Sequence, residues 1–281
     1  MRFRGIETVD WSQPINWDWG PNRGLKNWWL AVPNAMGFGS KTWRDLRFAN
    51  HGTLTNMDAA TDWRGPQSAK RGFASVDFVG SSTQLCDFGQ VSALDSVTEF
   101  TMIGCGSKTA GSSSWCMGTG ASGTVRSEIL WFSDDNVYVS VNAIYRTYTG
   151  LSGQSGKPFH FAFVFRGNAS YTLYINGVEV SISGTGSIPT VTSSAAAQGS
   201  FWLGRCANNR YTTGWHESAR IYSRALSGTE IAEIHRDALD GYPNSLNRVL
   251  LSRDYSSVAA SGFNPVWSAY HNVLLNAGLS S

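Results

Sequence analysis

The acidic residues of the chain lack the spacing of a glycosidase pair. Glycoside hydrolysis on a β-sandwich needs two carboxylates on one strand face, about 5.5 Å apart in a retaining enzyme, which the pattern Glu-x-Asp-x-x-Glu supplies. The sequence contains no such triplet, and Glu128 has no partner acid on its own face of the segment Glu128-Ile-Leu130. We therefore expect Glu128 to be a structural residue at a strand edge, and we expect the chain not to be an enzyme.

Two polar loops carry groups that bind sugars or calcium. Asn208, Asn209, Arg210 and Tyr211 combine planar hydrogen-bonding groups with an aromatic ring, so they are the candidate glycan-binding residues. Asp134 and Asp135 offer carboxylate oxygens of the kind that Ca²⁺ prefers, and Ca²⁺ is the one cofactor that the sequence suggests. A solvated loop without a ligand is the alternative for both segments, and Arg and aromatic residues also suit a protein interface.

The remaining reactive side chains are predicted to be structural. The five histidines are scattered and form neither a His-x-x-x-His pair nor a Ser/His/Asp order with a nucleophile elbow. The glycine-rich stretch Gly118–Gly123 lacks the lysine and the helix that follow a phosphate-binding loop. The four cysteines, none in a C-x-x-C pair, are expected to be free buried thiols: Cys86, Cys105, Cys116 and Cys206.

Composition and charge argue against several partners. Charged residues make up 15% of the 281 residues and the net charge is +2, whereas soluble domains average about 25% charged residues. No basic run resembles a phosphate-tracking patch, so nucleic acid is not an expected partner. The start, Met1-Arg-Phe-Arg-Gly-Ile-Glu7, lacks the apolar stretch of a secretory signal, and no segment reaches the ~20 apolar residues of a membrane span. We expect no membrane partner.

Residue periodicity predicts strands over most of the chain and one helix near its end. Alternation is clear between 73 and 222, as in Val137–Val141, so two packed antiparallel sheets are expected there. Asn176-Gly177 lies between two alternating runs and predicts a type I′ hairpin, because both turn positions need positive φ. Ser227 and Glu230 have the spacing of a capping box and predict a helix over 228–239.

Three segments resemble the laminin G-like/concanavalin A-like family. They are Ser75–Gly80, the pair Phe159–Phe165 and Tyr171–Gly177, and the closing run Gly214–Ser227 with Glu230-Ile231. The resemblance implies an all-β, jelly-roll β-sandwich over 45–241, with a short C-terminal helix and extended arms at 1–44 and 242–281. Glu217 and Ser218 stand where the family usually has Asp and Glu, which argues against a metal role there.

A second resemblance, to laminin G-like proteins of bacteriophages, rests on the N-terminal part of the chain and on one segment near its end. It is carried by Asp10-Trp11-Ser12, Asn27–Leu30, Trp43–Leu46, Asn50–Leu54 and Tyr242–Arg248. It implies a non-catalytic virion component, either a capsid decoration or a tail-fibre protein, located in the virion and contacting other virion proteins and further copies of itself. The alternative is a carbohydrate-binding lectin that attaches to cell-surface or environmental glycans.

Overall fold

The computed structural model describes residues 6–9, 14–31, 39–64, 74–109, 114–120, 125–132, 135–206, 209–239 and 248–251, the first and last of these as backbone only. The elements of the sandwich are β2 (Leu25–Leu30), β3 (Thr42–Trp43), β4 (Gly52–Thr55), β5 (Trp63–Arg64), β6 (Ser75–Phe78), β7 (Leu85–Asp87), β8 (Glu99–Lys108), β9 (Trp115–Thr119), β10 (Ser127–Trp131), β11 (Val137–Val141), β12 (Ile144–Tyr148), β13 (Phe159–Arg166), β14 (Ser170–Ile175), β15 (Val178–Val180), β16 (Phe201–Leu203), β17 (Arg205–Cys206), β18 (Arg210–Tyr211), β19 (Gly214–Tyr222) and α2 (Gly228–Leu239).

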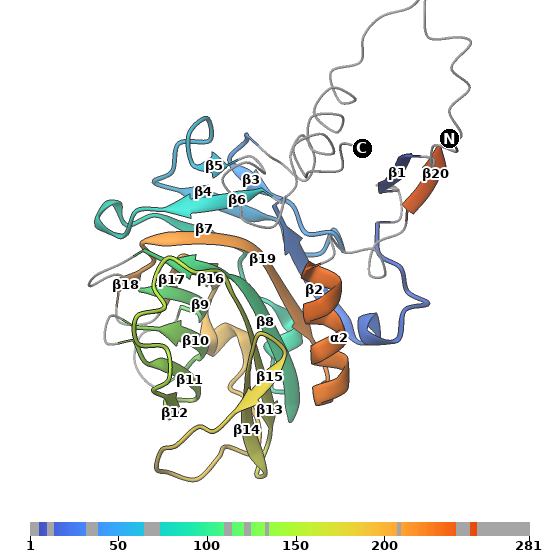
Figure 1. Ribbon diagram of the computed structural model, residues 1–281. Helices are drawn as coiled ribbons and strands as arrows, with labels where there is room; N and C mark the ends of the chain where they lie inside the picture. The colour runs from blue at the N-terminus through green and yellow to red at the C-terminus, as the bar shows by residue number, and fades with distance from the viewer. Residues whose placement is uncertain are drawn as a thin grey trace, which may run out of the picture.

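The strands form two antiparallel sheets packed face to face (Figure 1). Sheet 1 has the order β12-β11-β10-β9-β16-β7-β4-β3, and sheet 2 has the order β15-β14-β13-β8-β19-β6-β5 with β2 also paired to β19. The two-sheet architecture predicted for 73–222 is confirmed. The Asn176-Gly177 turn is confirmed as well, since φ is +52° and +80° at its two residues and Ile175 pairs with Val178.

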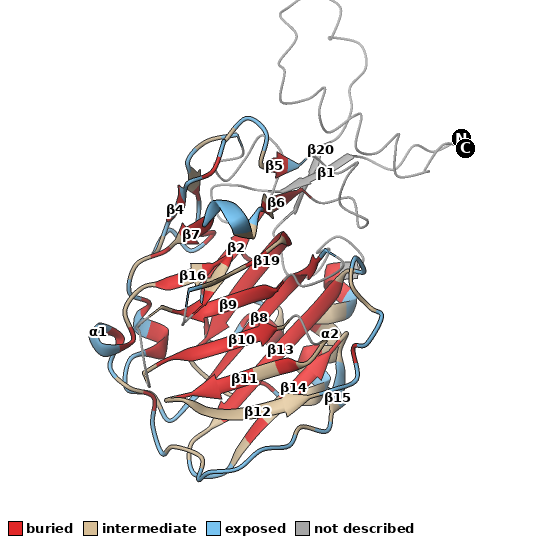
Figure 2. Ribbon diagram, turned by 90° about the vertical axis from the view of Figure 1, so that its left-hand side faces the viewer, coloured by how far each residue is buried: buried red, intermediate tan, exposed pale blue. Residues whose placement is uncertain are grey.

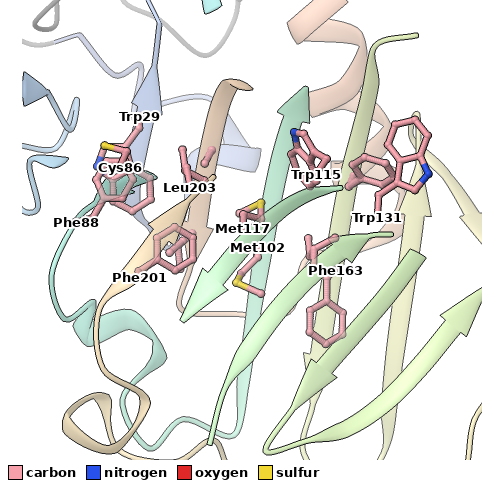
Figure 3. Close-up of a cluster of buried hydrophobic side chains, with 14 of the residues drawn as sticks. Trp29, Cys86, Phe88, Met102, Trp115, Met117, Trp131, Phe163, Phe201 and Leu203 are labelled. Atoms are coloured by element: carbon pink, nitrogen blue, oxygen red, sulfur yellow. The ribbon is translucent and has the colours of Figure 1, made fainter. Parts of the chain in front are cut away.

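A core rich in aromatic residues fills the space between the sheets. Along β9, β10 and β16 every second residue faces inward, and Figure 3 shows Trp115, Met117, Trp131, Phe201 and Leu203 gathered there. The ring centroids of Trp115 and of Phe161 on β13 are 5.1 Å apart, which is within the range of favourable aromatic contacts. Figure 2 shows the resulting distribution, with buried strands at the centre and half-buried β12 at one edge.

The outer face of sheet 2 is covered by α2 and by the N-terminal part of the chain. Ile231, Ile234 and Ala238 of α2 pack with Ile103, Ala162 and Val164 of the sheet and with Trp28 of β2. The predicted capping box holds, since Glu230 N donates to Ser227 Oγ at 3.2 Å and Ser227 N donates to Glu230 Oε2 at 2.9 Å. Both faces of β13 are therefore buried, which suits its nearly all-apolar sequence.

Two observations bear on the arms predicted at 1–44 and 242–281. Leu25–Leu30 and Thr42–Trp43 are strands of the sandwich, so the sheets already include residues that the sequence assigned to an arm. The backbone of β1 (Ile6–Val9) pairs antiparallel with that of β20 (Arg248–Leu251). The rest of 1–13 and 242–281 lies outside the described residues. Within the described part of the chain, no helix is long and apolar enough to cross a membrane.

Candidate functional site

One row of residues crosses the outer face of sheet 1. Strand pairing aligns Tyr145, Ser140, Glu128, Gly118, Trp202 and Asp87, one residue from each of six neighbouring strands. Directly paired residues point to the same side of a sheet. Because their neighbours along the strands fill the core, this row faces away from it. The outer face of sheet 1 thus brings together polar and aromatic side chains that are distant in the sequence.

A buried ion pair occupies the middle of this row. Arg126 Nε lies 3.1 Å from Glu128 Oε1, and the two side chains are 6% and 2% exposed. Ser140 Oγ donates to the same carboxylate oxygen at 3.2 Å, and the Arg126 guanidinium lies 4.9 Å from the centroid of the Tyr145 ring. Burying a carboxylate without a partner costs several kcal/mol, so Arg126 is what allows Glu128 to be there. Glu128 is also paired on both sides, to β9 and β11, and does not lie at an edge of the sheet as expected.

The short hairpin of β17 and β18 lies over the same face. Cys206 packs against Cys116 of β9 and Leu130 of β10. Thr212, which directly follows the hairpin, accepts a hydrogen bond at its Oγ1 from Cys116 N at 3.0 Å. The thiol of Cys116 and burial together raise the pKa of Cys206 well above its ordinary value. The buried Cys206 sulfur therefore serves packing rather than nucleophilic chemistry. All four cysteines are free and buried, as predicted.

Two arginines of the hairpin are held by aromatic rings. The Arg205 guanidinium carbon lies 4.1 Å from the centroid of the Trp202 ring and 5.6 Å from that of Tyr211, and Arg205 Nη2 donates to Asn209 Oδ1 at 2.6 Å. The Arg210 guanidinium carbon lies 3.8 Å above the Phe132 ring. Arg205, Arg210, Trp202 and Tyr211 are all partly exposed. Among the described residues, neither guanidinium forms an ion pair with a carboxylate.

A glycine makes room for the ring beneath Arg205. A Cβ atom built on Gly120 would lie 1.8 Å from the Trp202 ring, which is far inside van der Waals contact. The indole therefore packs directly on the backbone after β9, with the guanidinium of Arg205 over it. This arrangement fixes the plane of the guanidinium and leaves it at the surface of the sandwich.

The structure places the predicted glycan-binding residues on this hairpin. Asn209, Arg210 and Tyr211 lie on or beside β18, whereas Asn208 lies outside the described residues. Trp202, Arg205 and Phe132 were not predicted from the sequence. Trp202 could have been found from its strand, because an aromatic residue between inward-facing Phe201 and Leu203 must point outward.

The predicted calcium ligands have a different surrounding. Asp134 lies outside the described residues, and Asp135 Oδ1 lies 2.7 Å from the Nζ of fully buried Lys108. The hydrogen bond from Lys108 lowers the pKa of Asp135. A carboxylate that already holds an ammonium group is a poor cation ligand, and no cluster of three or more His, Cys, Asp or Glu side chains occurs among the described residues. Asp135 and its described neighbours do not fit a calcium ion. Because Asp134 lies outside the described residues, calcium binding at this loop stays a prediction from sequence.

Comparison with known families identifies the architecture. Residues 100–232 match a family model, Laminin_G_3, described as the concanavalin A-like lectin/glucanases superfamily. The sandwich has the concanavalin A-like fold. The matched range includes β9, β10, β16 and the β17–β18 hairpin, which carry most of the row and both ring-held arginines. A comparison with curated protein sequences gave no match.

Several solved structures are similar to this concanavalin A-like sandwich. They include Trypanosoma rangeli sialidase in complex with sialic acid (13% identity, TM-score 0.51, 76% of this chain and 33% of that chain covered). A second is domain 4 of AbnA, a GH43 extracellular arabinanase from Geobacillus stearothermophilus, in complex with arabinotriose (16% identity, TM-score 0.50, 75% of this chain and 98% of that chain covered). A third is the botulinum neurotoxin serotype C1 binding domain (10% identity, TM-score 0.54, 78% of this chain and 53% of that chain covered). This chain spans only about a third of the sialidase, and such low identities show a shared fold alone.

The expectation that the chain is not an enzyme was wrong. Chains with this fold include sialidases, and the matched superfamily contains glucanases as well as lectins. The missing Glu-x-Asp-x-x-Glu pattern excluded one arrangement on one strand, whereas a sandwich can assemble a site from residues distant in sequence. The row that joins Glu128 to Trp202 and Asp87 shows that this sheet brings residues distant in the sequence onto one face.

Proposed function

We propose that this chain binds carbohydrate on the outer face of sheet 1, at the β17–β18 hairpin. The observation that carries the proposal is the cluster of Trp202, Arg205 and Tyr211, in which one guanidinium lies 4.1 Å and 5.6 Å from the centroids of two partly exposed rings. Sugar rings combine apolar faces, which pack on aromatic rings, with hydroxyl groups, which accept hydrogen bonds from planar donors. The partly exposed Tyr211 ring offers a surface for a sugar face, and Arg205, held on Trp202, offers planar donors within the same small area.

The similar structures add support without assigning a ligand. Domain 4 of AbnA has the same fold, spans nearly the same length as the matched part of this chain and is in complex with arabinotriose. At 16% identity this likeness does not transfer a sugar. It supports only the choice of carbohydrate as the class of ligand to test.

Binding to a panel of oligosaccharides, measured by calorimetry, tests the proposal. The informative variant is Trp202→Ala, which removes the ring under Arg205, and its matched control is Trp17→Ala. Trp17 also carries a stacked arginine, with the Arg47 guanidinium carbon 4.8 Å from its ring centroid, but it lies in the N-terminal segment. We expect the native chain and Trp17→Ala to bind alike, and Trp202→Ala to bind at least about tenfold more weakly, a loss of about 1.4 kcal/mol. Equal binding by both variants would place the carbohydrate site elsewhere.

A virion role is the second candidate, supported by the resemblance of the N-terminal segments to laminin G-like proteins of bacteriophages. In this role the chain would be a capsid decoration or a tail-fibre component that displays the sandwich. The two roles are compatible, because a displayed glycan-binding face would attach a particle to its surroundings. Mass spectrometry of purified phage particles whose genome encodes this chain tests the role, and absence of the chain from the particles would rule it out.

A further inference from the structure

The outer face of sheet 1 carries positive charge that its own carboxylates do not balance. Glu128 is already paired with Arg126, and Asp135 is paired with Lys108. Asp87, the neighbour of Trp202 in the row, accepts a hydrogen bond from Gly89 N at 2.8 Å. Arg205 and Arg210 have no carboxylate partner among the described residues, although both guanidinium groups lie at the surface. Within the described residues, two guanidinium groups without a carboxylate partner therefore stand against one carboxylate, that of Asp87, because a bond from a neutral amide does not cancel its charge.

These two guanidinium groups are also held in place before any ligand arrives. Rings hold both of them, at 4.1 Å for Arg205 on Trp202 and 3.8 Å for Arg210 on Phe132. Packing of Cys206 on Cys116 and Leu130 anchors the hairpin to the sheet. A long side chain that is already ordered loses less conformational entropy on binding than a free one does. The arrangement is therefore suited to a ligand that pairs with guanidinium.

We infer that the sugar bound at this hairpin is acidic, with carboxylate or sulfate groups that pair with Arg205 and Arg210. This inference rests on the proposed carbohydrate-binding function and names the class of its ligand. A guanidinium donates two parallel N–H bonds to a carboxylate or sulfate, and such charge-assisted bonds are stronger than bonds to a neutral hydroxyl. A neutral sugar would leave both cations without a counter-charge, whereas an acidic sugar supplies it.

An acidic sugar fits these observations better than a nucleic acid does. Proteins that bind nucleic acids neutralise many phosphates with a broad basic surface. Here the net charge of the whole chain is only +2, and the cations near this face that lack a carboxylate partner among the described residues are two arginines on one short hairpin. The aromatic rings of Trp202 and Phe132 are engaged by these arginines and so are not free to stack on bases.

The test compares matched charged and neutral saccharides by calorimetry at low salt. The pairs are trigalacturonic acid with its methyl ester, sialyllactose with lactose, and sulfated lactose with lactose, so that carboxylate and sulfate are distinguished. The variants are Arg205→Gln and Arg210→Gln, with Arg236→Gln as a control that removes the same charge from exposed Arg236 on α2, over the other sheet. A single-stranded oligonucleotide and inorganic sulfate complete the panel.

We expect the charged member of at least one pair to bind about tenfold or more tightly than its neutral partner. High salt should reduce this advantage, Arg205→Gln and Arg210→Gln should each remove most of it, and Arg236→Gln should keep it. Equal binding of charged and neutral members would overturn the acidic ligand while leaving the carbohydrate function in place. Binding of no saccharide would reject both proposals. Tight binding of the oligonucleotide, or of inorganic sulfate as well as any sugar, would also overturn the inference.

Discussion

His216 is a fully buried titratable side chain near the centre of the sandwich. Its ring stacks on Trp115 at 4.5 Å and meets Phe78 edge-on at 5.2 Å, and burial lowers its pKa from 6.5 to about 3. Between these two pH values the unfolded chain binds a proton at this position and the folded chain does not. The contribution of His216 to the free energy of unfolding is therefore complete above pH 6.5 and is lost as the pH falls. The loss for this one group is at most about 1.4 kcal/mol per pH unit.

The variant His216→Phe removes this proton while keeping a flat ring among aromatic neighbours. We expect its free energy of unfolding to fall less steeply than that of the native chain as the pH is lowered from neutral toward about 4. Urea unfolding at several pH values measures both slopes, and the comparison cancels the contributions of all other groups. If the two slopes are the same, the imidazole titrates alike in the folded and unfolded states.

Single residues were predictable from sequence where their role is local. Positive φ at Asn176 and Gly177 follows from the turn that joins two alternating runs. The stack on Arg205 could not be predicted, because Trp202 and Tyr211 meet it only after the hairpin folds over the sheet. The role of Glu128 was missed for the same reason. Arg126, the partner of Glu128, is only two residues away in the sequence. The burial of Glu128, however, depends on which segments cover the strand in the folded chain.

The start of α2 depends on Glu230, which connects the helix to the end of β19. Burial raises the pKa of this carboxyl group, but hydrogen bonds from Arg224 and from the Ser227 N–H and hydroxyl outweigh burial and lower the pKa to about 2. The stabilising effect is complete above the ordinary value of 4.5 and is lost as the pH falls toward 2. We expect Glu230→Gln to destabilise the fold by about 1 kcal/mol at neutral pH, the usual size of a capping contribution.

Glu233→Gln is the matched control for this prediction, because it removes a carboxylate from the same helix outside the capping box. Urea unfolding at neutral pH should show a loss for Glu230→Gln and little change for Glu233→Gln. The difference between the native chain and Glu230→Gln should shrink as the pH is lowered below 4.5. A difference that does not change with pH would mean that the charge of Glu230 is not what stabilises the helix.

The end of β9 controls the position of the Trp202 ring. Because a Cβ on Gly120 would overlap this ring, Gly120→Ala must move the indole and the Arg205 guanidinium above it. The φ of Gly120 is not in the left-handed region, so alanine is tolerated by the backbone itself. We expect carbohydrate binding to weaken about tenfold or more. Gly20→Ala, where no atom lies within 4 Å of the added Cβ, should bind as the native chain does. Unchanged binding by Gly120→Ala would separate the ligand site from Trp202.

Elements were predictable where their two faces differ or where a clear signal bounds them. The helix followed from its capping box and apolar stripe, and β11 followed from its alternation. Strand β2 was assigned to an arm because its sequence does not alternate. Both of its faces are buried, since Trp28 packs under α2 and Trp29 packs between the sheets. A strand that is buried on both faces has no alternation to read. Only its pairing with β19, distant in the sequence, makes Leu25–Leu30 a strand of the sandwich.

At the scale of the whole molecule, the described residues of the two main hydrophobic clusters extend from Ile15 to Ala238. One cluster fills the space between the sheets and the other lies under α2. Beyond these limits the described chain has Pro14, Leu239 and the strands β1 and β20, which pair with each other. Removing 242–281 would delete β20 and leave the backbone of β1 without this partner strand. An exposed strand edge is a surface on which another chain can pair.

We therefore expect deletion of 242–281 to leave the sandwich folded, with nearly the same urea midpoint and near-ultraviolet circular dichroism. Large apolar residues such as Phe263 and Trp267 in the deleted segment are atypical of a solvated tail. Under the proposed virion role, we expect the same deletion to abolish self-association or attachment to virion proteins. Light scattering after gel filtration measures the association state. A second variant that also lacks 1–13, and with it β1, shows whether any remaining assembly comes from the exposed edge of β1. If the first variant unfolds at a lower urea concentration, the segment contributes to the core; if both variants still assemble, the contact between copies lies on the sandwich itself.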